Sequence, residues 1–235
     1  RGEAMLSKED RQAIETAVAA AELRTSGEIY CVTAQDSADY VETPLAWAAA
    51  AALLGPAVLL LAGVHVSAPD LTSGWTAAQV GRAAETAAHG ALLGAILLQA
   101  ALFVGVGLFT AWRPVRLWVT PAAVKRERVR RRARELFIAK NVTATRARTG
   151  VLIYVSHAER MAELVADEGI SSRVDPAAWT PPMDALIAGL KHGDAGKGFR
   201  DAVALCADIL AVHAPADAND NPNELPDSVV ELPRV

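Results

Sequence analysis

Two long runs without a charged residue dominate the hydropathy pattern of this 235-residue chain. They cover residues 45–66 and 87–112, and at a rise of ~1.5 Å per residue each is long enough to cross a ~30 Å hydrocarbon core. Gly55 and Pro56 interrupt the first run, which a membrane helix tolerates when its neighbours satisfy the freed carbonyl. We therefore predict a two-helix transmembrane hairpin over 45–112. The alternative is a buried, alanine-rich hairpin of a soluble core.

Amphipathic and alternating segments flank the two runs. Ser7 is an N-cap residue before a helix that extends to about Leu23. Residues 28–33, EIYCVT, alternate and are rich in β-favouring side chains, so they predict a strand. After the second run, Thr120 as cap and Pro121 as first residue start a helix that ends near Ala139. Its predicted apolar face consists of Val124, Val129, Ala133, Leu136 and Phe137.

The last third of the chain mixes strands and helices. Residues 150–156 form a nearly continuous apolar run typical of a central strand, and residues 161–166 return after a polar turn. Helices are expected over 180–193 and 197–213. The fold class is then α/β, with helices packed on a small mixed sheet. The proline-rich, acidic residues 214–235 predict a flexible tail, whose apolar end at 229–235 is a candidate docking peptide.

This pattern divides the chain into four parts. Residues 1–44 and 113–213 are the two halves of one α/β domain, residues 45–112 are the hairpin inserted between them, and residues 214–235 are the tail.

Local charge is more informative than the net charge of −4. The loop between the spans, residues 67–86, carries Arg82 as its single cation, whereas the segment after the second span is rich in arginine. The positive-inside rule then predicts that both termini are cytoplasmic and that the short loop lies outside. The expected location is a bacterial inner membrane, with the chain as a multi-pass protein. The arginines expected to face anionic lipid are Arg126, Arg128, Arg130, Arg131, Arg132 and Arg134. Nucleic acid is a poorer partner, because no aromatic platform accompanies them.

Small and polar residues mark the second run as a packing element. Gly90 and Gly94 form a GxxxG motif that predicts close packing against the first helix, and Gln99 is a candidate hydrogen-bonding residue within the membrane. Trp75 is expected to be an interfacial anchor, with a short helix over 76–88 leading into the second span.

Candidate chemistry is sparse. Asp167 and Glu168, joined by Asp36, Asp39 or Asp175, are the one group of carboxylates suited to Ca²⁺ or Mg²⁺, although acidic turns are usually only solvated.

Three other features suggest chemistry but have simpler interpretations. His157 and Glu159 suggest an acid/base pair, but turn histidines are usually surface residues. The run GDAGKG at 193–198 lacks the P-loop spacing and reads as a helix end followed by a turn. Cys31 and Cys206 are too far apart in the sequence to suggest a metal motif and are expected to be buried, reduced thiols.

The segments SGEIYCVTA at 26–34, RTGVLIYVS at 148–156 and ERMAELVADEGI at 159–170 resemble the TPM domain family. This family is found in thylakoid phosphatase-like proteins, photosystem accessory proteins and a receptor-modulating membrane protein. The resemblance implies that RTGVLIYVS pairs beside EIYCVT. It also implies one of two activities, because some members look like divalent-cation-dependent acid phosphatases and others are non-catalytic accessory factors. The chain departs from the family pattern at RGEAMLS and ADEGI, where an aspartate and a glycine pair are typical.

The sequence therefore favours a non-catalytic accessory, assembly or regulatory subunit of a membrane protein complex, without a cofactor. The alternative is a membrane-anchored, divalent-cation-dependent acid phosphatase. A lesser possibility is a sensor of membrane charge that acts through the arginine-rich helix.

Overall fold

The computed structural model describes residues 5–63, 76–216 and 224–234. The chain separates into two compact units, Arg1–Asp39 with Pro121–Val235 and Tyr40–Thr120. The second unit is thus inserted into the first, and the boundaries fall at 39/40 and 120/121 instead of the expected 44/45 and 112/113.

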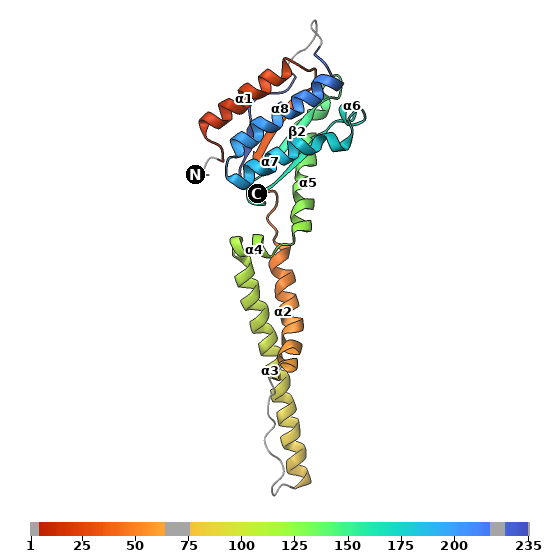
Figure 1. Cartoon of the computed structure of the whole chain (residues 1–235). Coiled ribbons are helices and arrows are strands. Elements are labelled where there is room, and N and C mark those ends of the chain that lie inside the picture. Colours follow the sequence, from red (N-terminus) through yellow and green to blue (C-terminus); the bar gives the residue numbers. More distant parts are fainter. Residues whose placement is uncertain (1–4, 64–75, 217–223, 235) are drawn as a thin grey trace. The chain divides into compact units, whose positions relative to one another are not determined.

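The first unit is built on a four-stranded mixed sheet (Figure 1). The strands are β1 (Ile29–Ala34), β2 (Val151–Ser156), β3 (Met161–Ala166) and β4 (Val230–Leu232), in the order β3-β2-β1-β4. β1 runs parallel to β2 and β4, and β2 runs antiparallel to β3. The expected pairing of the two apolar strands is confirmed, with Ile29 opposite Val151.

Helices cover both faces of this sheet, because alternate strand residues point to opposite sides. Ile29 and Cys31 pack with α1 (Lys8–Glu22), α7 (Thr180–His192) and α8 (Ala195–His213). Tyr30 and Val32 pack with α5 (Ala122–Ala139) on the other face. Short elements α6 (Glu168–Ser171), η1 (Val142–Ala144) and η2 (Pro176–Trp179) complete the unit. The result is a helix–sheet–helix arrangement with two apolar cores.

Most helices and strands of this unit begin and end within two residues of their predicted boundaries. The predicted cap of α5 is an exception. Ser7 caps α1 by accepting a hydrogen bond from Asp10 N at 2.9 Å, as expected. Thr120 does not cap α5, because its hydroxyl donates to Arg116 O at 2.7 Å and so closes the preceding helix. Val124 is also not part of the buried face, with 36% of its surface exposed.

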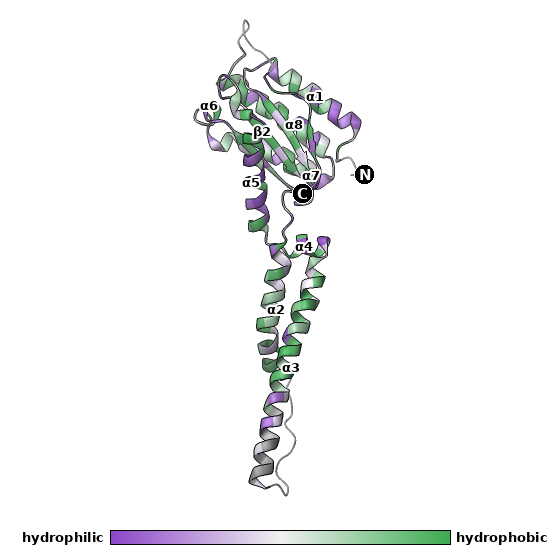
Figure 2. Ribbon diagram, turned by 180° about the vertical axis from the view of Figure 1, so that it is seen from behind, coloured by the Kyte–Doolittle hydropathy of each residue, from purple (hydrophilic) through white to green (hydrophobic). Residues whose placement is uncertain are grey.

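The second unit consists of α2 (Glu42–Leu61), α3 (Ala77–Ala111) and α4 (Arg113–Val119). Both α2 and α3 are long and apolar enough to cross a membrane, and Figure 2 shows their hydrophobic colouring. Residues 76–88 form no separate short helix, because α3 is continuous from Ala77. The α4 helix is not evident in the hydropathy pattern. Trp75 and residues 64–66 of the first predicted span lie outside the described residues.

The predicted flexible tail is wrong for part of its length. Residues 230–232 add β4 to the sheet beside β1, with Val230 opposite Val32 and Leu232 opposite Ala34. Residues 230–232 of the expected docking peptide therefore pair within the chain itself, and docking on a partner stays a prediction.

Candidate functional site

Exposed apolar surface is the main feature of the second unit. Leu53 and Leu61 of α2 are 72% and 89% exposed, and leucines of α3 such as Leu97 and Leu108 are similarly open. Exposed leucine on this scale is unusual in water and ordinary in lipid, where the surrounding acyl chains are equally apolar. These helices therefore present the surface that a membrane span requires.

Small residues bring α2 and α3 together. A Cβ added to Gly55 would lie 2.5 Å from Leu102 Cδ1, and one added to Gly107 would lie 3.5 Å from Ala48 Cβ. Such close approach is how small residues pack membrane helices. At the base of this unit the hydroxyls of Thr43 and Thr120 are hydrogen-bonded at 3.1 Å.

The predicted role of Gly90 and Gly94 in this contact is wrong for the residues described. A Cβ at either position would meet no described atom within 4 Å. Because Gly55 faces Leu102 and the helices are antiparallel, α2 ends near residue ~95 of α3, before it reaches these glycines.

Gln99 lies half-buried on α3, and within the described ranges its side chain has no hydrogen-bond partner. The predicted hydrogen bond to another membrane segment is therefore not made in the described part of the hairpin, and a bond to a partner subunit stays a prediction.

The α5 helix places its arginines on distinct surfaces. Val129, Ala133, Leu136 and Phe137 are buried against the sheet, which fixes the rotation of the helix. Arg130 then lies 3.5 Å from Glu163 of β3, while Arg131 and Arg132 lie 2.9 and 3.6 Å from Glu135. Three of the six arginines expected to face lipid therefore lie beside acidic side chains of the α/β unit itself.

Asp167 and Glu168 are held by an arginine. Arg148 donates to Asp167 Oδ1 at 3.1 Å and to Glu168 Oε2 at 3.0 Å. Asp167 is 3% exposed and also caps α6 through Glu168 N, whereas Glu168 is 76% exposed. Asp167 Oδ2 is buried without a hydrogen-bond partner among the described residues. A guanidinium between the two carboxylates supplies the positive charge that a cation would otherwise bring.

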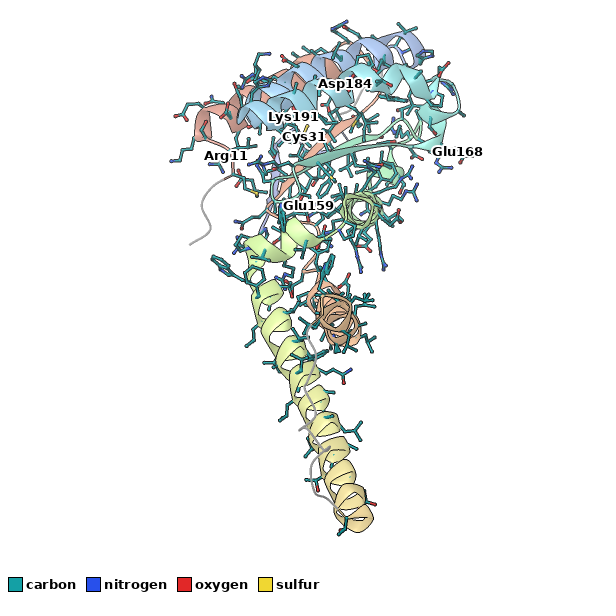
Figure 3. All side chains as sticks on the ribbon, turned by 60° about the horizontal axis from the view of Figure 1, so that its bottom comes forward. Arg11, Cys31, Glu159, Glu168, Asp184 and Lys191 are labelled. Carbon is teal, nitrogen blue, oxygen red and sulfur yellow. The ribbon has the colours of Figure 1, made fainter. Side chains whose placement is uncertain are left out.

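The other carboxylates suggested for the same cation site lie elsewhere. Asp36 follows the end of β1, and because β3 runs back antiparallel, Asp167 lies at the opposite end of the sheet. Figure 3 labels Glu159 near the Asp36 end and Glu168 at the other. Asp175 caps η2 through Ala177 N. Among the described residues no group of three metal-ligating side chains is present.

His157 and Glu159 have separate partners. His157 Nε2 lies 2.8 Å from Thr33 Oγ1, and burial lowers the pKa of His157 against the opposing effect of Glu231. Glu159 accepts a hydrogen bond from Ser37 N at 3.0 Å and a second from the Ser156 hydroxyl. The candidate acid/base pair is therefore not assembled.

The GDAGKG run is a helix junction, as predicted. Gly193 ends α7 with a φ of 76°, a conformation that glycine adopts readily, and Asp194 caps α8 by accepting from Lys197 N at 2.8 Å. Cys31 and Cys206 are both buried free thiols, and burial raises the pKa of Cys206 to about 12.

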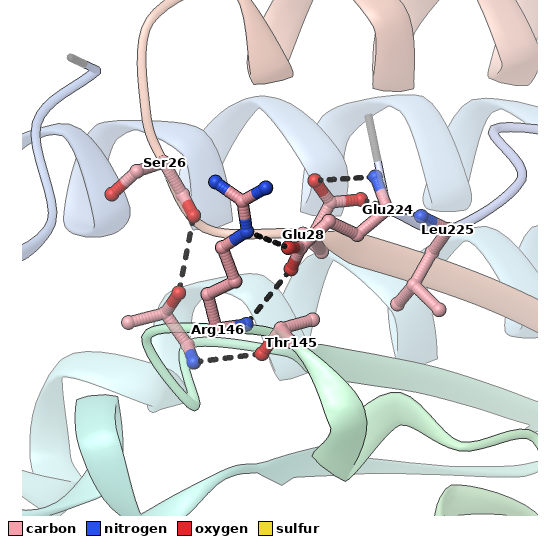
Figure 4. A network of polar contacts seen from close by, with 7 residues as sticks. Ser26, Glu28, Thr145, Arg146, Glu224 and Leu225 are labelled. Atoms are coloured by element: carbon pink, nitrogen blue, oxygen red, sulfur yellow. Dashed lines mark hydrogen bonds and ion pairs between the residues drawn. The ribbon is translucent and has the colours of Figure 1, made fainter. Parts of the chain in front are cut away.

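A carboxylate cluster missed by the sequence analysis anchors the C-terminal segment. Glu28 accepts hydrogen bonds from Glu224 N at 3.3 Å and Leu225 N at 3.1 Å, and Arg146 N donates to Glu224 at 2.9 Å (Figure 4). Nearby, burial and the charge of Glu28 raise the pKa of Glu22 to about 8. No local pattern reveals this cluster, because its members are separated by about 200 residues.

Comparison with known proteins gives a likeness of fold. No protein-family model matches the chain, and no curated protein sequence matches it significantly. A solved structure is similar: the NMR structure of the BA42 protein from the psychrophilic bacterium Bizionia argentinensis. It is 17% identical, with a TM-score of 0.56 over 98% of both chains. The chain therefore shares its overall fold with that protein.

Proposed function

We propose that this chain is a membrane-anchored, non-catalytic accessory, assembly or regulatory subunit of a larger membrane protein complex. The observation that carries the proposal is the insertion of two apolar, outwardly exposed helices into an α/β unit. A hairpin inserted within that unit anchors it to the bilayer through two chain connections, which suits a docking role at a membrane surface.

Charge supports a bacterial inner-membrane location with the α/β unit in the cytoplasm. Arg113 and Arg116 follow the second span at once, and α5 adds further arginines, whereas the loop between the spans carries Arg82 alone as a cation. Each cation near an anionic leaflet contributes roughly 1 kcal/mol of attraction. Anionic lipid is thus a second partner in the proposal.

The accessory role also draws on the resemblance to the TPM family, whose non-catalytic members assist membrane complexes. The acid phosphatase is the weaker proposal, because Arg148 occupies the two carboxylates expected to hold its cation. Gln99 is the proposed contact with a partner subunit, since a polar side chain at membrane depth gains most from a hydrogen bond there.

Purification of the tagged full-length protein from its native membrane in a mild detergent tests the proposal, with native electrophoresis and mass spectrometry of what stays bound. We expect a defined complex that is weakened by Gln99→Leu, which removes the amide and keeps the bulk. The matched control is Leu97→Met, an exposed position on the same helix.

Recovery of the wild-type chain alone would count against the accessory role. If the protein hydrolyses a phosphate monoester in the presence of Mg²⁺ or Ca²⁺, and Asp167→Asn abolishes this activity, the phosphatase proposal replaces the accessory role.

A further inference from the structure

A pocket of about 260 Å³ lies between α5 and the loop that follows β1. Its walls are residues 37–39 of the loop and Arg128, Arg131, Arg132 and Glu135 of α5. We infer that this pocket binds a phosphate group, and the inference rests on the proposed membrane anchoring for its lipid source.

The spacing of the α5 residues produces the pocket. Positions 128, 131, 132 and 135 follow the i, i+3, i+4, i+7 pattern, so their side chains share one face of the helix. Three guanidinium groups and two carboxylates, those of Asp39 and Glu135, line the pocket, which gives it a formal charge of +1. That charge matches a phosphodiester, which carries a single negative charge.

Glu135 positions two of these arginines without using all their donors. It lies 2.9 Å from Arg131 Nε and 3.6 Å from Arg132 Nη1. A guanidinium has five N–H donors in a planar fork that suits phosphate oxygens, so each group keeps donors for a ligand.

Arg132 provides the second observation. Its Nε is buried and, within the described part of the chain, has no hydrogen-bond acceptor. Buried N–H donors are nearly always paired, and an unpaired one signals a missing partner. A phosphate oxygen in the pocket that Arg132 lines would supply this donor with an acceptor.

The opposite wall is fixed in place. Ser37 N donates to Glu159 Oε1 at 3.0 Å, and Ser37 Oγ is 3.0 Å from Tyr154 Oη. Tyr154 is a fully buried residue of the central strand β2. The loop is therefore held to the sheet before any ligand binds, which lowers the entropic cost of binding.

The chain connects one wall of the pocket directly to the first apolar helix. Asp39 is three residues before α2, so at most ~11 Å of extended chain separates it from the first apolar helix. A phosphate in the pocket comes from a lipid headgroup or from solution, and the chemistry of recognition is the same.

Binding is tested with the full-length protein in neutral detergent. The probe is a short-chain, fluorescently labelled phosphatidylglycerol, read by anisotropy, and the control probe is the matching diacylglycerol, which lacks the phosphate headgroup. Inorganic phosphate is tested separately by equilibrium dialysis. Variants are Arg131→Gln, Arg132→Gln and Arg173→Gln, the last of which removes the same charge from an exposed position of the α/β unit outside both the pocket and α5.

We expect saturable binding of the phosphatidylglycerol and a dissociation constant about tenfold higher in Arg131→Gln and Arg132→Gln, with Arg173→Gln within about twofold of wild type. If inorganic phosphate shows this variant pattern and the lipid does not, the source is soluble phosphate. Arg131 is 68% exposed, so its variant stays informative even if Arg132→Gln fails to fold.

Equal binding of both lipid probes together with no binding of inorganic phosphate, or equal losses in all three variants, would overturn the pocket. Complex recovery in the same variants separates the two proposals. An intact complex without phosphate binding removes only the pocket, and phosphate binding without a complex removes only the accessory role.

Discussion

Glu22 lies in an environment that the local sequence pattern does not predict. It lies at the end of an ordinary amphipathic helix, yet burial and the nearby charge of Glu28 raise its pKa from 4.5 to about 8. Its Oε1 accepts a hydrogen bond from Ile29 N at 3.3 Å. The native chain therefore keeps a proton here that the unfolded chain releases at much lower pH.

This shift makes stability depend on pH. Below about pH 4.5 both states hold the proton, and between there and about pH 8 the native state alone holds it, so stability falls as pH rises through this window. Since one pKa unit corresponds to about 1.4 kcal/mol, the loss amounts to a few kcal/mol.

We expect Glu22→Gln to flatten this dependence and to be more stable than wild type at pH 8. The free energy of unfolding is measured at several pH values between about 4.5 and 8 by denaturant titration of the full-length protein in detergent, with circular dichroism as the signal. Glu15→Gln is the control, because Glu15 is exposed on the same helix. Parallel curves for wild type and Glu22→Gln would contradict the buried acid.

Single residues were predictable where the signal is local. Gly193 at a helix end and the buried thiols of Cys31 and Cys206 follow from neighbouring residues and side-chain chemistry. The hydrogen-bond partners of His157 and Asp167 could not be predicted in this way. Strand register brings Thr33 to His157, and a turn brings Arg148 to Asp167. Hydrogen-bond partners depend on tertiary contacts that periodicity does not encode.

Strand β4 is one of the elements that local patterns missed. Three residues in a proline-rich, acidic segment give no strand signal, and pairing with β1 rather than propensity makes them a strand. Leu225 is buried beside them, and Glu28 receives two backbone hydrogen bonds from the same segment.

Removal of residues 224–235 should therefore destabilise the α/β unit and expose β1 as an edge strand. We expect the free energy of unfolding to fall by on the order of 1–3 kcal/mol, which lowers the melting temperature by several degrees. Faster amide hydrogen exchange should be confined largely to β1. Unchanged exchange in β1 would show that the segment is not a structural strand.

The hairpin offers a matched pair of glycines. Gly55 contacts Leu102, whereas Gly90 has no described neighbour where its side chain would be. Gly55→Leu should separate the helices at a cost of about 1–3 kcal/mol, and Gly90→Leu should be nearly neutral.

Thermal unfolding of both variants in the same detergent measures the loss of stability that each substitution causes. Equal losses would mean that Gly90 packs as closely as Gly55, as the GxxxG motif alone suggested.

At the scale of the molecule, the charge-free runs were sufficient to predict the inserted hairpin, because length and hydropathy are read directly from sequence. Hydropathy could not predict the parallel pairing of β1 with β2, because about 115 residues separate the two strands. Only the resemblance to a known family implied this pairing. The arginine pocket could likewise not be predicted from the sequence, because it depends on how α5 is rotated on the sheet.

Labelling of introduced cysteines in intact bacterial spheroplasts tests the central claim, that this is a membrane protein with a cytoplasmic α/β unit. The substitutions T76C, between the spans, and S172C, in the α/β unit, lie at exposed positions, while both native cysteines are buried. We predict that a membrane-impermeant maleimide labels T76C from outside and reaches S172C only after lysis. Labelling of S172C in intact spheroplasts, or of neither site until lysis, would contradict the account.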